Sequence, residues 1–143
     1  MQTGADTGMH TNDAFRLLVV EDNPADARLL EEAFAEADVA VEIAEARNGE
    51  DALELLRECP TPEAVILDLN LPRMDGRELL SAIRGDPKLC QLAVVVLSTS
   101  HYDADIDACR RLGVRSYVIK PAKFDEFVEI ARRIGRLCGE LRC

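Results

Sequence analysis

Several features that mark membrane, secreted or nucleic-acid-binding proteins are missing from this sequence of 143 residues. No apolar run approaches the length of about 18 residues that a membrane-spanning helix needs. The start, MQTGADTGMHTND, has neither the basic region nor the apolar segment of a secretory signal. Lys and Arg number 17 against 27 Asp and Glu, and the net charge of −10 disfavours binding to DNA or RNA phosphates. We therefore expect a cytoplasmic protein that binds neither membrane nor nucleic acid.

Paired cysteines are also lacking. The five cysteines are an odd number, and no two of them have CxxC spacing: Cys59, Cys90, Cys109, Cys138 and Cys143. This pattern disfavours a zinc site or a disulfide framework and favours reduced cytosolic thiols. Cys143 ends the chain, where exposure would allow artefactual cross-linking.

Five short apolar runs are the most regular feature of the chain. Most are continuous, as is typical of strands buried on both faces: Leu17–Val20, Val39–Ile43, Val65–Leu67, Leu92–Leu97 and Tyr117–Ile119. Apolar residues at helical spacing lie between and after them. Strand and helix alternating five times predict an α/β fold with a doubly wound, five-stranded parallel sheet.

Residues that begin or end helices lie between these runs. They are Asn23 before Pro24, Asn48, Asp75 with Glu78, and Gly113. The last helix is expected to begin near Lys123 and to continue almost to the chain end. Its apolar stripe predicts packing on the sheet; the alternative is that its end reaches a second subunit. The expected organisation is a flexible tail over residues 1–13 and one domain over residues 14–143.

Polar residues follow four of the five apolar runs directly. Glu21 and Asp22 follow the first run, Asp68 the third, Ser98 the fourth and Lys120 the fifth. In an open parallel sheet these strand ends meet at one edge, where ligands bind. The sequence therefore predicts a functional site built from these residues.

The residue types indicate the chemistry of that site. Three neighbouring carboxylates repel one another unless a cation compensates them, and Mg²⁺ prefers such oxygen ligands together with water and phosphate. Lys120 adds a positive charge and Ser98 a hydroxyl, which together can stabilise a transferring phosphoryl group. Asp68 can act as the nucleophile and form an aspartyl phosphate.

The motifs around these residues resemble the receiver domain of two-component response regulators over residues 14–138. The matching segments are the Glu21-Asp22 pair, DLNLPRMDG with Asp68, VVVLSTS with Ser98, and SYVIKPA with Tyr117 and Lys120. A narrower resemblance, carried by EDNPADARLLEEAF, is to single-domain regulators paired with bacterial phytochromes and related sensor histidine kinases.

The resemblance implies a flavodoxin-like sheet with strand order 2-1-3-4-5 and five helices. It implies that Asp68 accepts a phosphoryl group from a sensor histidine kinase. Asp22 and Asp68 are expected to ligate Mg²⁺ directly, Glu21 through water, and Asn70 through its backbone carbonyl. The bond between Lys120 and Pro121 is expected to be cis, as is usual in the family.

The resemblance also implies a two-state switch. Phosphorylation would draw in Ser98 and let Tyr117 turn inward, which would change the face formed by the fourth helix, the fifth strand and the fifth helix. Asn70 could orient the water that removes the phosphate, and Thr99 could narrow access for the donor. A downstream protein or phosphotransfer partner would read that face, and a homodimer through the fourth or fifth helix is our expectation.

Two alternatives remain beside this signalling module, which would catalyse only its own phosphorylation and dephosphorylation. One is a Mg²⁺-dependent phosphohydrolase with an aspartyl-phosphate intermediate. Such enzymes usually place a general acid two residues after the nucleophile, where this sequence has Asn70. The other is a scaffold that acts without phosphorylation, although every acceptor-site residue is present.

Overall fold

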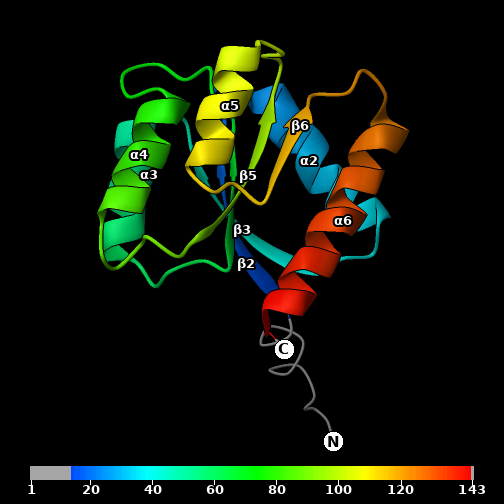
Figure 1. The fold of residues 1–143 in the computed structure, drawn as a ribbon. Coiled ribbons are helices and arrows are strands. Elements are labelled where there is room, and N and C mark those ends of the chain that lie inside the picture. Colours follow the sequence, from blue (N-terminus) through cyan, green and yellow to red (C-terminus); the bar gives the residue numbers. More distant parts are fainter. Residues whose placement is uncertain (1–13, 143) are drawn as a thin grey trace, which may run out of the picture.

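The computed structural model describes residues 14–142, so the predicted tail and the predictions for Cys143 lie outside the described residues. Strands and helices alternate along this range (Figure 1). In chain order they are β2 (Phe15–Val20), α2 (Pro24–Glu36), β3 (Val41–Ala46), α3 (Gly49–Glu58), β4 (Ala64–Leu67), α4 (Gly76–Gly85), β5 (Ala93–Ser98), α5 (Asp103–Arg111), β6 (Ser116–Ile119) and α6 (Phe124–Arg142). No helix in this range is long and apolar enough to cross a membrane.

The five strands form one parallel sheet in the order β3-β2-β4-β5-β6. This is the order 2-1-3-4-5 counted along the chain, so the predicted fold class is confirmed. The second strand lies at the sheet edge but spans Val41–Ala46 rather than Val39–Ile43. Its bounds follow from residue-by-residue pairing with β2, from Phe15 with Val41 to Val20 with Ala46. The prediction from the apolar run was shifted, because exposed and half-buried residues are interspersed along this edge strand and its sequence is not continuously apolar.

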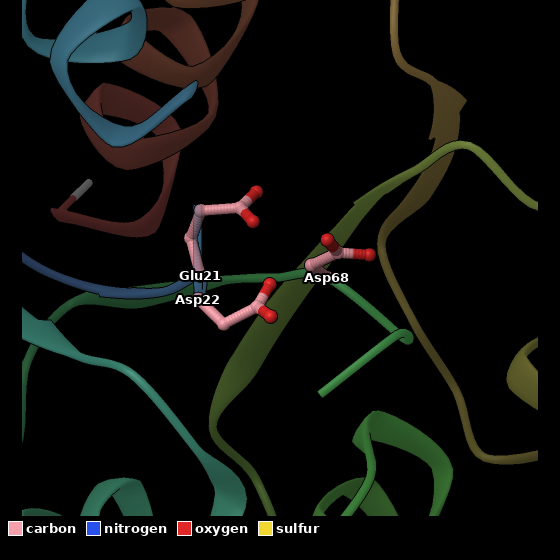
Figure 2. A group of neighbouring side chains, drawn as sticks. All are labelled: Glu21, Asp22 and Asp68. Carbon is pink, nitrogen blue, oxygen red and sulfur yellow. The ribbon is translucent and has the colours of Figure 1, made fainter. Parts of the chain in front are cut away.

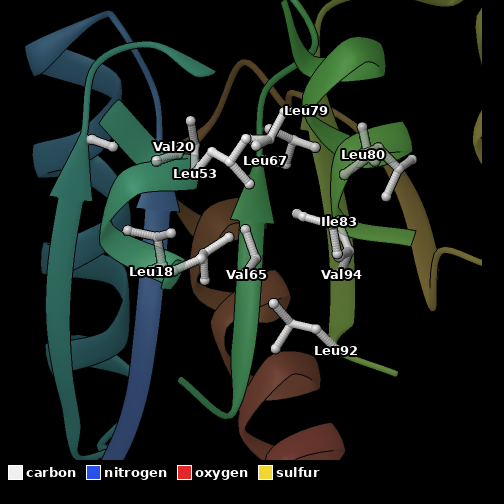
Figure 3. Packing of buried hydrophobic residues seen from close by; sticks show 14 of the residues in the cluster. Leu18, Val20, Leu53, Val65, Leu67, Leu79, Leu80, Ile83, Leu92 and Val94 are labelled. Carbon is white, nitrogen blue, oxygen red and sulfur yellow. The ribbon is translucent and has the colours of Figure 1, made fainter. Parts of the chain in front are cut away.

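Side chains of the central strands point alternately to two separate cores. Leu18 and Val65 belong to the core under α3 and α4 (Figure 3), whereas Leu17 and Ile66 belong to the core under α2 and α6. Helices therefore cover both faces of the sheet, which explains why the strand sequences are continuously apolar.

The predicted helix boundaries are confirmed by side-chain contacts. Asn23 accepts hydrogen bonds from the first-turn N–H groups of α2, and Asn48 does the same for α3. Asp75 and Glu78 form a reciprocal capping box at the start of α4. Gly113, just after α5, has a φ of 73°, a backbone conformation that favours glycine.

The apolar stripe of α6 packs on the sheet, as its main interpretation predicted. The last residue of the helix, Arg142, also binds within the same chain. Its guanidinium forms an ion pair with Glu63, donates a hydrogen bond to the Ala14 carbonyl oxygen (3.0 Å) and lies 4.4 Å from the ring centroid of Phe15. The end of α6 is thus anchored at the amino end of the sheet.

Candidate functional site

The three predicted carboxylates come together at the carboxyl ends of two neighbouring strands. Glu21 and Asp22 follow β2, and Asp68 follows β4, which pairs with β2 in the sheet. One ligand oxygen from each side chain lies within 4.8 Å of the others. Figure 2 shows the three side chains gathered there. Glu21 and Asp68 are buried, whereas Asp22 is exposed.

The loop after β4 orients the Asp68 carboxylate. The Asp68 N–H donates to the carbonyl oxygen of Val20, and Asp68 Oδ1 accepts from the Asn70 N–H at 3.1 Å. The loop returns so closely that a Cβ on Gly76 would lie 2.6 Å from the Asp68 carbonyl oxygen. Only glycine fits at position 76, because any side chain there would clash with the backbone of Asp68. The close approach of this loop in turn holds Asp68 in place.

Lys120 reaches the cluster from the end of β6. Its Nζ lies 3.0 Å from Asp68 Oδ2, 2.7 Å from Glu21 Oε1 and 2.8 Å from Asp26 Oδ2. Burial by itself would lower the pKa of Lys120, but hydrogen bonds to these three carboxylates outweigh it and raise the pKa above its usual value. Lys120 is therefore a fixed positive charge beside Asp68.

Asp26 is the site residue that sequence reasoning missed. It lies in the first turn of α2, three positions after the cap Asn23. An acid there is common at a helix start and gives no separate signal. Its pairing with Lys120 depends on where α2 lies over the sheet, which local patterns do not specify.

The charges in this pocket do not balance. Four carboxylates, those of Glu21, Asp22, Asp26 and Asp68, accompany the Lys120 ammonium. Burial, together with the nearby Asp68 charge, raises the pKa of Glu21 to about 7, although the hydrogen bond to Lys120 opposes this shift. A cluster of oxygen donors with excess negative charge fits a hard divalent cation.

The hydroxyl residues line the neighbouring strand ends. Ser98 is fully buried at the end of β5, and its Oγ accepts from the Ser100 N–H at 3.2 Å. The next residue, Thr99, accepts a hydrogen bond from the Asn70 side-chain amide at 3.2 Å. This bond connects the loops after β4 and β5 at the mouth of the site.

Tyr117 on β6 is half-buried and packs against the core under α3 and α4. Its hydroxyl donates to the Ser100 carbonyl oxygen at 2.8 Å. Burial raises the pKa of Tyr117. The ring therefore lies inward, against the core and the loop after β5. The switching role that the resemblance implies for Tyr117 stays a prediction.

The predicted cis bond before Pro121 is wrong. No peptide bond between residues 14 and 142 is cis, so the bond from Lys120 to Pro121 is trans. Trans is the intrinsically favoured isomer of an X–Pro bond. Lys120 reaches Asp68 with this trans bond, so its direction does not require the less favourable isomer.

A parallel sheet in this order, with acids and a lysine gathered at its carboxyl edge, defines a flavodoxin-like receiver fold. The sequence profile of the response regulator receiver domain matches residues 17–132, and the chain belongs to this family. It is a response regulator receiver of two-component signalling rather than a conventional enzyme.

The similar proteins include regulators associated with phytochromes. Response regulator Rcp1 of Synechocystis sp. is 36% identical over 124 residues, which cover 82% of this chain and 84% of Rcp1. The crystal structure of the phosphorylated cyanobacterial phytochrome response regulator RcpA is similar with a TM-score of 0.78 and 39% identity, covering 85% of this chain and 91% of RcpA. The crystal structure of the Mn²⁺-bound form of Rcp1 is similar with a TM-score of 0.77 and 35% identity, and the match covers 84% of this chain and 91% of Rcp1.

Proposed function

We propose that Asp68 accepts a phosphoryl group from a sensor histidine kinase in a Mg²⁺-dependent reaction. The observation that carries this proposal is the geometry around Asp68: its carboxylate lies in a cluster of acids, with the Lys120 ammonium 3.0 Å away. A carboxylate oxygen attacks phosphorus while the bond from phosphorus to the donor imidazole nitrogen breaks. Lys120 is already positioned to pair with the added negative charge.

The carboxylates of the cluster would hold the cation in different ways, some directly and one through water. Asp22 and Asp68 would ligate the cation directly, Glu21 would act through water, and the Asn70 carbonyl would supply another oxygen. Bound Mg²⁺ supplies charge neutralisation for the carboxylates and the incoming phosphoryl oxygens. Divalent-cation binding is supported by the carboxylate geometry and by the Mn²⁺-bound relative.

The phosphoryl group changes the face formed by α5, β6 and α6, which a downstream protein or phosphotransfer partner reads. Ser98 and Tyr117 connect Asp68 to this face, because Ser98 ends the strand next to β4 and Tyr117 binds the loop that follows Ser98. The same face is where a second copy of the chain would bind. The similarity to RcpA supports a phytochrome-type histidine kinase as the donor.

Asn70 and Thr99 set the lifetime of the phosphorylated state. Their hydrogen bond places an amide and a hydroxyl at the mouth of the site, where water and donor must enter. The residue at position 70 also argues against a phosphohydrolase. Such enzymes use a general acid two residues after the nucleophile, and the Asn70 amide cannot serve as one.

Labelling with acetyl phosphate tests the proposal. The wild-type protein should gain one phosphoryl group with Mg²⁺ and none with EDTA, as read by intact mass. Asp68→Asn should gain none. Asp103→Asn, which removes an exposed carboxylate on α5, should be labelled like the wild type. Labelling of Asp68→Asn, or a wild type that stays unlabelled with Mg²⁺, would refute the assignment.

A further inference from the structure

α5 is the helix with the weakest apolar anchoring in the described part of the chain. It buries a single residue, Cys109, whereas α2, α3, α4 and α6 each bury at least four. Its N-cap residue, Tyr102, makes no side-chain capping bond. The position of α5 must therefore depend strongly on polar contacts from its neighbours.

Two arginines of α4 bind the two ends of α5. Arg77 Nη1 lies 3.1 Å from Asp105 Oδ1 in the first turn of α5. Arg84, two helical turns further along α4, donates to the carbonyl oxygens of Leu112 (2.6 Å) and Gly113 (3.1 Å) just after α5.

The two ends are held with different strength. Arg84 also donates to the carbonyl oxygens of Cys90 and Leu92, so its guanidinium satisfies four backbone acceptors and is half-buried. The Arg77 side chain is 50% exposed and makes one ion pair with α5. The C-terminal end of α5 is thus firmly fixed, whereas a single carboxylate holds its first turn to α4.

That carboxylate also connects α5 to the switch residues. Asp105 Oδ2 accepts from the Ser100 hydroxyl at 2.5 Å, and the Ser100 carbonyl oxygen accepts from the Tyr117 hydroxyl at 2.8 Å. The Ser100 N–H in turn donates to Ser98 Oγ. One chain of contacts therefore runs from α4 through Asp105 and Ser100 to β6 and to the end of β5.

We propose that Arg77 and Asp105 form a latch that holds the first turn of α5 against α4 and, through Ser100, holds Tyr117 inward. When the latch opens, α5 moves about its Arg84-bound end. The inference rests on the proposed function, in which α5 is part of the surface that partners read. Arg77 and Asp105 are then positioning residues for the switch.

The direction of the effect follows from the position of Tyr117. The latch stabilises the inward ring, which is the orientation that phosphorylation is expected to select. Opening the latch lowers the population of this conformation and hence the apparent affinity for a phosphoryl mimic. Because the ion pair is partly exposed, we expect a change of about two- to fivefold.

Fluorine NMR can follow this ring directly, because the sequence contains two tyrosines, Tyr102 and Tyr117. With 3-fluorotyrosine incorporated and Mg²⁺ present, Asp105→Asn and Arg77→Gln should shift or broaden the Tyr117 resonance. Both variants should need about two- to fivefold more beryllofluoride for half-saturation. Asp103→Asn makes the same charge change in the same helical turn and should behave as wild type, and the double variant should match the single ones.

Thiol alkylation separates local opening from general destabilisation. Cys109 is buried in α5, and Cys138 is buried in α6 as an internal control. In the latch variants, peptide mass spectrometry should show faster alkylation of Cys109 and an unchanged rate at Cys138. Equal acceleration of both cysteines, or an unchanged Tyr117 resonance with wild-type beryllofluoride affinity, would overturn the latch.

These readouts also distinguish the latch from the proposed function. The alkylation rates and the Tyr117 resonance with Mg²⁺ alone require no phosphoryl group. If wild-type Asp68 is labelled by acetyl phosphate but the variants behave as wild type, the latch fails and the proposed function stands. If wild type is not labelled, the proposed function fails whatever the variants show.

Discussion

Two glutamates at opposite ends of the same sheet show opposite electrostatics. Glu21 follows the carboxyl end of β2, and its pKa is raised to about 7 by burial and by the Asp68 charge. Glu63 directly precedes β4 at the amino end, and its pKa is lowered by hydrogen bonds from Arg142 and from the Arg16 N–H, although burial opposes the shift.

The difference lies in how deeply each carboxylate is buried and in the charges beside it. Glu63 receives a guanidinium and a backbone donor, so its charged form is well satisfied. Glu21 also receives a backbone donor, the Asn23 N–H, but burial and the nearby Asp68 charge disfavour its charged form. The Lys120 ammonium, which Glu21 shares with Asp26 and Asp68, offsets only part of this. The amino end of the sheet thus stabilises the fold, whereas the carboxyl end keeps an excess of negative charge for a cation to compensate.

Removing Lys120 should have the largest effect on stability, because it leaves the acid cluster without its ammonium. We expect Lys120→Met to lower the free energy of unfolding by about 3 kcal/mol in EDTA. Mg²⁺ should recover part of this loss. Urea unfolding with and without Mg²⁺ measures both effects, with the exposed Lys88→Met as control. An unchanged stability in EDTA would show that the cluster does not depend on this charge.

The raised pKa of Glu21 predicts a stability that depends on pH. Between its unfolded value of 4.5 and its folded value of about 7, the folded state binds more protons, so stability falls as pH rises through this window. Glu21→Gln removes this contribution. Without metal, its stability relative to wild type should rise by roughly 2 kcal/mol from pH 4.5 to 7.5.

Urea unfolding at both pH values measures this difference. Saturating Mg²⁺ should reduce it, because the cation compensates the ionised carboxylate in the wild type. If the difference in unfolding free energy between Glu21→Gln and wild type is the same at both pH values, the raised pKa of Glu21 is contradicted.

At the opposite end, Arg142→Met should lower the free energy of unfolding by about 1 kcal/mol at pH 7. Because the folded pKa of Glu63 is lowered, this stabilisation is present above the unfolded value of 4.5 and is lost as pH falls through the folded value. Acetyl phosphate labelling should not change. Arg136→Met, on the exposed side of α6, provides the control, and a loss of labelling in Arg142→Met would break the separation between the two ends.

The smallest effect is expected at the mouth of the site. Asn70→Lys removes the amide that bonds Thr99 and should lengthen the half-life of the phosphorylated state several-fold. Its decay after removal of the phosphodonor can be followed by intact mass. Gln91→Lys adds the same charge away from the site and should decay like wild type. If the phosphorylated state decays at the same rate in both variants, Asn70 does not control its half-life.

The sequence by itself determined the alternation of elements, the helix caps and the residues at the strand ends. The continuous apolar runs required a sheet covered on both faces, and the caps Asn23, Asn48 and Asp75 act on N–H groups within three residues. The gathering of Glu21, Asp22, Asp68 and Lys120 was predictable because parallel strands end at one edge.

Only the tertiary structure decided which distant charges meet. Three ion pairs join residues that are far apart in the chain: Asp26 with Lys120, Arg77 with Asp105, and Arg142 with Glu63. Each pairing depends on how a helix lies over the sheet, and exposed acids and bases occur throughout this sequence. Apolar periodicity determines which face of a helix is buried, but the neighbour that each polar side chain meets follows from the packing of whole elements.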